Sequence, residues 1–183
     1  MDTVIGTVTD RKVLLTLFFR DSHFMIAVLL PDKTHLSVIN ALNNLESILG
    51  SCKFFELFPI IITDNGSEFF NPNLIELGIS GLKRTSVYYC DPGASWQKPG
   101  IEKNHEYIRY VLPKGTSFDD LTQDDVTLMM NNINSTVRAS LKGHHPFELA
   151  AQLFGKNTIE ALGIKEIAPE AVTLLPSLLK HNK

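Results

Sequence analysis

The sequence is poor in cysteine and has no long hydrophobic run. Its two cysteines, Cys52 and Cys90, form no CxxC pair, so neither a zinc site nor a disulfide framework is predicted. No uninterrupted apolar run approaches the roughly 18 residues that a membrane span needs. The start of the sequence shows no basic-then-apolar leader pattern. Together these absences favour a reduced, cytoplasmic setting.

The chain also lacks an excess of positive charge. Its formal net charge is -3, which by itself argues against a dedicated nucleic-acid binder. The charge is unevenly spread, however, because residues 83–114 carry six basic against three acidic side chains. With 183 residues, 44% of them hydrophobic and 20% charged, the composition is that of one folded domain with a real core.

An aspartate directly after an apolar run is the most informative feature. The run Phe58–Ile62 is followed by Thr63, Asp64, Asn65 and Gly66, which is typical of a strand that ends in a turn. An acid at the carboxyl end of a strand lies at the lip of a sheet, where metals and substrates commonly bind in α/β proteins.

Two further acids are candidate partners for Asp64. Asp2 opens a β-branched stretch, with Asp10 and Asp21 as alternatives, and Glu102 begins a helical pattern, with Glu106 as its alternative. Three carboxylates from distant segments suit hard divalent cations, which prefer oxygen ligands. Two such ions about 4 Å apart promote phosphoryl transfer. The spacing alone does not show that the acids converge.

The apolar pattern predicts an alternation of strands and helices. Steps of three and four residues indicate helices, and short apolar runs between turn residues indicate strands. The expected strands are 3–8, 12–19, 23–30, 60–62 and 85–89, and the expected helices are 34–49, 73–77, 97 or 101 to 112, 122–140 and 146–154. Residues 90–100 are expected to form a loop, and the tail from 163 to be extended apart from a short leucine-rich end.

At this point three motifs resemble those of a known family. They are Asp2 on the first strand, Thr63–Phe69, and Asp91–Asn104, which is followed by the stop at Leu112–Thr116. In this order, and with 37 residues between Asp64 and Glu102, they resemble the catalytic core of DDE transposases and retroviral-type integrases. The similarity is greatest to transposases of bacterial insertion sequences of the IS-thirty group, and it covers about residues 1–155.

The resemblance implies a fold and an activity. The expected fold is α/β and ribonuclease H-like, with a five-stranded mixed sheet flanked by helices over 1–155 and a C-terminal extension of the same domain over 156–183. Asp2, Asp64 and Glu102 would be the catalytic, metal-binding triad, holding two Mg²⁺ or Mn²⁺ ions. The activity would be cleavage of DNA at the element's ends and transfer of the freed strand into target DNA, by a chain that self-associates on DNA in the bacterial cytoplasm and nucleoid.

Several residues are predicted to contact DNA rather than metal. They are Asn65, Trp96, Lys98, Lys103, Arg109 and Lys114. Glu68 is interpreted as a first-turn acid that complements a helix dipole, and His105 as a core-facing residue.

Two alternatives stay open. One is a retroelement integrase core, which shares all three motifs, and the other is a non-catalytic, integrase-derived module for DNA binding or assembly. The family's helix-turn-helix region would precede Asp2 and is not in this sequence. We therefore expect weak sequence-specific DNA binding.

Overall fold

Three antiparallel strands form the central sheet of the protein. A computed structural model describes residues 1–91, 98 and 100–182, without side chains for 180–182. Strands β1 (Asp2–Ile5), β2 (Val13–Phe18) and β3 (Met25–Leu30) pair in that order, with Asp2 opposite Thr16. The residues of β2 are buried on both faces, as its uninterrupted apolar run predicts.

Two parallel strands form a second sheet beside the first. Strand β4 (Ile60–Thr63) pairs with β5 (Ser86–Tyr89). The prediction of one five-stranded sheet is therefore wrong for the described residues, although the predicted strands are present. The two sheets are joined where the Met1 amino group donates to the Ile62 carbonyl, 2.7 Å away. Met1 directly precedes β1, and among the described residues β1 and β4 form no ladder.

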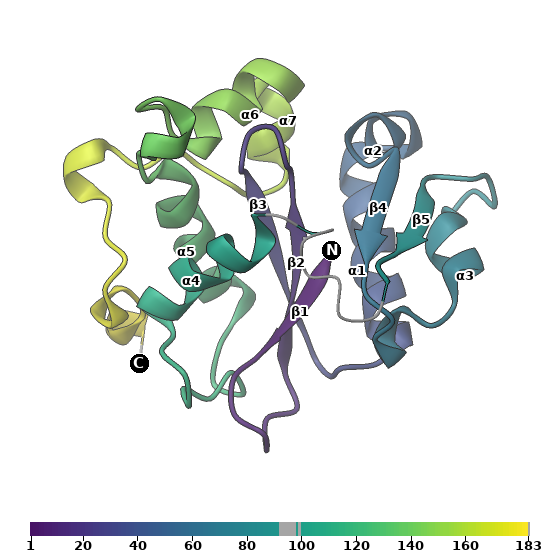
Figure 1. The fold of residues 1–183 in the computed structure, drawn as a ribbon, viewed down its shortest axis with the longest axis horizontal. Coiled ribbons are helices and arrows are strands. Elements are labelled where there is room, and N and C mark those ends of the chain that lie inside the picture. Colours follow the sequence, from purple (N-terminus) through teal and green to yellow (C-terminus); the bar gives the residue numbers. More distant parts are fainter. Residues whose placement is uncertain (92–97, 99, 183) are drawn as a thin grey trace.

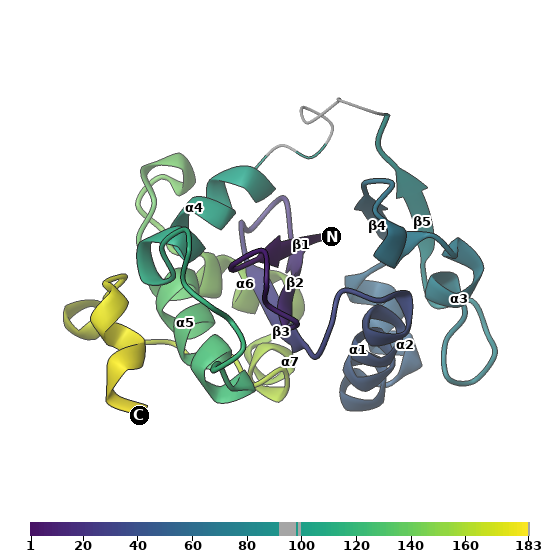
Figure 2. The ribbon, with the colours of Figure 1, turned by 90° about the horizontal axis from the view of Figure 1, so that it is seen from below.

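Helices cover both sides of the central sheet. Figures 1 and 2 show the sheet between two groups of helices, one of which lies with β4 and β5. This group comprises α1 (His35–Leu49), α2 (Ser51–Leu57) and α3 (Pro72–Glu76). The other comprises α4 (Ile101–Val111), α5 (Gln123–Ser135), α6 (Pro146–Phe154) and α7 (Lys156–Ala161). Single 3₁₀ turns lie at Ser67–Phe69, Ala139–Leu141 and Pro169–Ala171, and a longer 3₁₀ helix spans Pro176–Asn182.

The helices differ from the prediction at three places. Gly50 ends helix α1 as expected, but a second helix, α2, starts at the next residue. The positive φ of Gly50 changes the direction of the chain between the two helices. Helix α5 ends at Ser135, not Ser140, since Thr136 is extended. Helix α7 lies between the predicted third helix, which ends at Phe154, and the tail predicted from Gly163, where no element was predicted. Ile159 of α7 and Ile164 of the tail are buried in the core.

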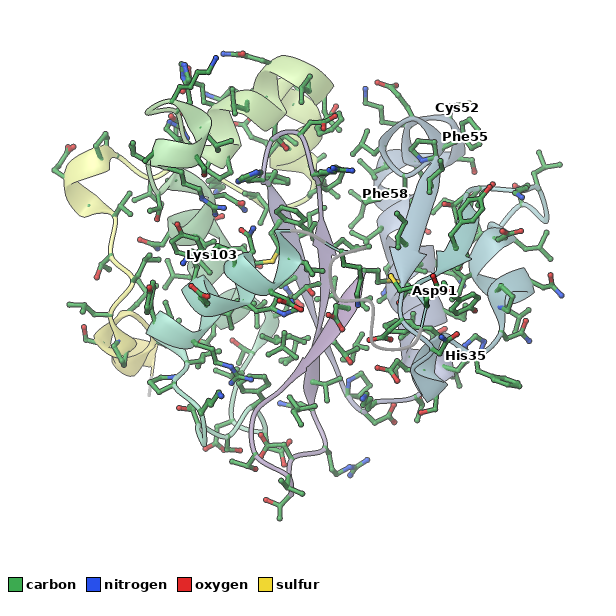
Figure 3. All side chains as sticks on the ribbon, viewed as in Figure 1. His35, Cys52, Phe55, Phe58, Asp91 and Lys103 are labelled. Carbon is green, nitrogen blue, oxygen red and sulfur yellow. The ribbon has the colours of Figure 1, made fainter. Side chains whose placement is uncertain are left out.

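Aromatic rings pack across the division between the two sheets. The ring of Phe19, just after β2, lies 5.2 Å from that of Phe58 and 5.1 Å from that of Phe154. Phe58 lies on the side of β4 that faces the central sheet (Figure 3). We call the part with β1, β2 and β3 and the part with β4 and β5 the two halves of the molecule. Between these halves, side chains pack but no strands pair. Within the part of the chain that the structure describes, no helix is long and apolar enough to cross a membrane.

Candidate functional site

Asp2 and Asp64 point their carboxylates at the same cation. The ammonium of Lys98 lies 3.2 Å from Oδ2 of Asp2 and 3.4 Å from Oδ2 of Asp64. Asp2 comes from the start of β1 and Asp64 from the end of β4, so two distant segments meet here. The side chain of Lys98 is only 13% exposed, which means that this ammonium is largely withdrawn from water.

Local hydrogen bonds orient both carboxylates. Oδ1 of Asp2 accepts from the Thr3 amide at 2.8 Å, and Oδ1 of Asp64 accepts from the Gly66 amide at 3.1 Å, which forms the turn after β4. The Oδ2 atom of each acid is left for a ligand. The predicted strand and turn thus position Asp2 and Asp64. The free Oδ2 atoms of both acids are directed at the Lys98 ammonium.

Lys98, which the sequence predicts to contact DNA phosphate, lies between two carboxylates in the structure. The ammonium occupies the position that a metal cation could take, so the pair of acids forms a site for positive charge.

Glu102 lies in the first turn of α4, where the sequence predicted it, and it is exposed. It borders an open hollow of about 560 Å³ together with His105, Glu106, Arg109 and Lys114. In the described part of the chain, no three His, Cys, Asp or Glu side chains are close enough together to hold a metal ion. The structure thus brings together two of the three predicted acids, and Glu102 borders a hollow whose lining includes neither of the other two.

Asp10, the alternative to Asp2, is occupied in a turn. Its carboxylate accepts hydrogen bonds from Thr7, Ser117 and the Phe118 amide. These bonds outweigh the opposing effect of desolvation and hold the pKa of Asp10 well below its usual range. Glu106, the alternative to Glu102, pairs with Lys103 on the same helix, where Figure 3 labels Lys103.

His105 is linked to the backbone of Asp2 through Thr16. The Thr16 hydroxyl donates to the Asp2 carbonyl at 3.1 Å and lies 3.0 Å from Nε2 of His105. A hydroxyl has one hydrogen, so Thr16, which donates it to Asp2, accepts from Nε2–H of His105. Burial, opposed by the nearby charge of Asp2, lowers the pKa of His105 to about 4. Its predicted role as a core-facing residue fits this environment.

The remaining predicted DNA contacts have partners within the protein or border the hollow. The Asn65 amide donates to the Cys90 carbonyl at 3.1 Å and ties the ends of β4 and β5 together. The Arg109 guanidinium donates to the Ile5 carbonyl at 2.8 Å. Lys114 borders the hollow beside Glu102, and Trp96 lies outside the described residues.

The sequence missed the position of Glu68. Its side chain is 2% exposed, and Oε1 accepts from the Thr3 hydroxyl at 2.6 Å and lies 3.4 Å from the Lys33 ammonium. The helix that it was expected to begin is only the 3₁₀ turn Ser67–Phe69, so a role in complementing a helix dipole does not explain it. The spacing of four residues between Asp64 and Glu68 was the sequence feature that could have indicated a role for Glu68 near Asp64.

Comparisons with known proteins agree with the motifs. No protein-family model matches the chain. It is 33% identical over 149 residues to the InsI transposase of insertion sequence element IS30A from Escherichia coli K12, which is 81% of this chain and 36% of that protein. It is 26% identical over 140 residues to the transposase of element IS1086 from Cupriavidus metallidurans, which is 76% of this chain and 39% of that protein. The chain thus spans less than half the length of these curated relatives.

A solved structure shares the fold. The catalytic core domain of BIV integrase aligns with a TM-score of 0.58 and 18% identity over 83% of this chain and 91% of that one. The predicted resemblance to IS30-type transposases and to an integrase core is therefore confirmed. The same alignment supports an α/β fold of the ribonuclease H-like type, with the sheet divided as described above.

Proposed function

We propose that this relative of the insertion-sequence transposases is a DDE-type catalytic core that cuts and joins DNA strands. The observation that carries the proposal is the pair formed by Asp2 and Asp64, which converge from two strands on one cation. Transposases among the sequence relatives, and an integrase core with the same fold, support the same reaction class.

The acids suit Mg²⁺ or Mn²⁺, because hard divalent cations prefer carboxylate oxygens. The Lys98 ammonium already lies between two of these carboxylates. Asp2 and Asp64 would hold such an ion, and Glu102 would complete the ligand set from α4. When bound, such ions would supply an activated hydroxyl or water and stabilisation of the leaving oxygen in phosphoryl transfer.

The residues of the chain have separable tasks in this proposal. Asp2 and Asp64 hold their Oδ2 atoms in place through the Thr3 and Gly66 amides. With a divalent ion held by the two acids, the Lys98 ammonium would be available to contact a DNA phosphate. Asn65, Trp96, Lys103, Arg109 and Lys114 remain candidate DNA contacts around the site.

The partners would be the element ends and target DNA. Joining two ends needs at least two active sites, so we propose that the chain self-associates on DNA, in the cytoplasm and on the nucleoid of a bacterial cell. Residues 1–155 would form the core proper and 156–183 its extension. The fold shared with BIV integrase favours a retroelement integrase core as the second candidate, with the same acids.

Nicking of supercoiled plasmid DNA in Mn²⁺ tests the proposal. Asp64→Asn and Glu102→Gln should each lower the nicking rate at least about a thousandfold, as the loss of one member of a catalytic group does. Asp124→Asn, at an exposed acid in the first turn of α5, is the matched control and should leave the rate unchanged. Wild-type nicking by Glu102→Gln would remove Glu102 from the site. A wild-type chain that never nicks would favour the non-catalytic module.

A further inference from the structure

Glu68 joins the strand that carries Asp2 to the turn that carries Asp64. Its Oε1 accepts from the hydroxyl of Thr3, the neighbour of Asp2, at 2.6 Å. Among the described residues, strands β1 and β4 share no ladder, and the Met1 amino group links the start of β1 to the Ile62 carbonyl of β4. The Thr3–Glu68 bond is therefore a side-chain connection between two elements that the site needs to hold in register.

The second oxygen of Glu68 lies near Gly66, as does the carboxylate of Asp64. Oε2 is buried and has no hydrogen-bond partner among the described residues. A Cβ placed on Gly66 would lie 2.7 Å from this atom and 3.1 Å from Oδ1 of Asp64. Both carboxylates thus border the same small space above Gly66, which only a residue without a side chain leaves open.

This arrangement is costly for the fold alone. A buried carboxylate loses its hydration, and the Lys33 ammonium beside it is itself 47% exposed, so it compensates only in part. An oxygen without a hydrogen-bond partner adds a further desolvation penalty. A buried acid that is only half satisfied, and that borders a carboxylate of the site, is more readily explained by a role in the site.

We infer that Glu68 is a positioning residue for the Asp2–Asp64 pair. Oε1 fixes the strand of Asp2 through Thr3, and Oε2 adds negative charge and a free acceptor beside Asp64. The inference rests on the proposed function, because it assumes that the pair binds a divalent cation. It assigns Glu68 no direct contact with the reacting DNA.

Binding of Mn²⁺, followed by isothermal titration calorimetry, tests this role without any catalytic readout. Glu68→Gln keeps the shape of the side chain and an acceptor for Thr3, but removes the charge. We expect it to weaken Mn²⁺ binding about tenfold or more, the usual effect of losing a residue behind a metal ligand. The melting temperature in EDTA should stay the same or rise, because a partly unpaired buried charge is gone.

Two further variants define the outcome. Thr3→Val removes the anchor but keeps the charge, and should also weaken Mn²⁺ binding. Glu76→Gln is the matched control, since Glu76 pairs with a half-exposed lysine in the same way but lies on α3, and its Mn²⁺ affinity should be that of the wild type. If Glu68→Gln does not fold, Thr3→Val decides the question.

Asp64→Asn separates this inference from the proposed function. If Asp64→Asn weakens Mn²⁺ binding and folded Glu68→Gln does not, the inference about Glu68 is wrong and the cation site stands. If Asp64→Asn also binds Mn²⁺ like the wild type, the proposed cation site itself is wrong.

Discussion

Thr16 connects a neutral histidine to the backbone of a proposed metal ligand. It accepts from His105 and donates to the Asp2 carbonyl, so α4 and β1 meet at one hydroxyl. The sequence identified His105 as core-facing from its step along the helix, and it identified Asp2 and Asp64 from their strand ends. It did not predict the ammonium between them or the burial of Glu68, because contacts between residues more than 30 positions apart leave no local pattern.

The low pKa of His105 makes stability depend on pH. The folded pKa is about 4 and the unfolded one is near 6.5, so between these values the unfolded chain binds the additional proton. The free energy of unfolding should therefore be fully maintained above pH 6.5 and fall as the pH drops toward 4, by at most about 3 kcal/mol.

Urea denaturation at a series of pH values measures this effect. His105→Gln should remove this part of the slope, whereas His144→Gln, at an exposed histidine before α6, serves as the control. A slope that is identical in His105→Gln and the wild type would show that His105 does not titrate in this way.

At the scale of elements, the start of α4 depends on a buried polar cluster. The Asn104 amide donates to the Gly100 carbonyl at 2.8 Å, and its oxygen accepts from the Arg138 guanidinium at 2.8 Å. Arg138 also lies 4.4 Å from the ring centre of Tyr107 and is 4% exposed. The helix itself could be predicted from its apolar steps. Its anchor could not, because Arg138 was expected inside a helix that in fact ends at Ser135.

Replacing Asn104 should loosen this end of α4. In Asn104→Ala the buried guanidinium loses an acceptor, so we expect the free energy of unfolding to fall by about 1–3 kcal/mol in urea denaturation. Lys103→Ala is the control one residue away. Its side chain is 66% exposed and its pair with Glu106 lies on the surface, so the change should stay within about 0.5 kcal/mol. Equal effects of the two changes would contradict the role of the cluster.

At the scale of the whole molecule, the sequence predicted the strands and most helices but not how the strands join. Hydrophobic runs and turn residues locate β1 to β5, since each is a local signal. Whether β1 and β4 pair depends on how far β1 extends beside β4. Among the described residues, the backbone hydrogen bond between them runs from the Met1 amino group to the Ile62 carbonyl. The five-stranded sheet was predicted from the family resemblance. In the described residues the five strands form one three-stranded and one two-stranded sheet.

Cohesion between the two halves should therefore depend on Phe19. Its ring packs on Phe58 from the β4 half and on Phe154 from α6, while Phe24 lies 5.8 Å away. Because Phe19 is only partly buried, Phe19→Ala should cost about 2–3 kcal/mol, somewhat less than for a ring inside a core. Phe70→Ala removes a ring that is 82% exposed and should change stability by less than about 0.5 kcal/mol.

The form of the transition tests cohesion more directly than its midpoint. If side chains alone couple the halves, unfolding of Phe19→Ala followed by near-ultraviolet and by far-ultraviolet circular dichroism should give separate midpoints, whereas the wild type should give one. Coincident midpoints in Phe19→Ala, with a loss below about 1 kcal/mol, would mean that α1 and its contacts with β3 and the turn after β4 hold the halves together without this ring.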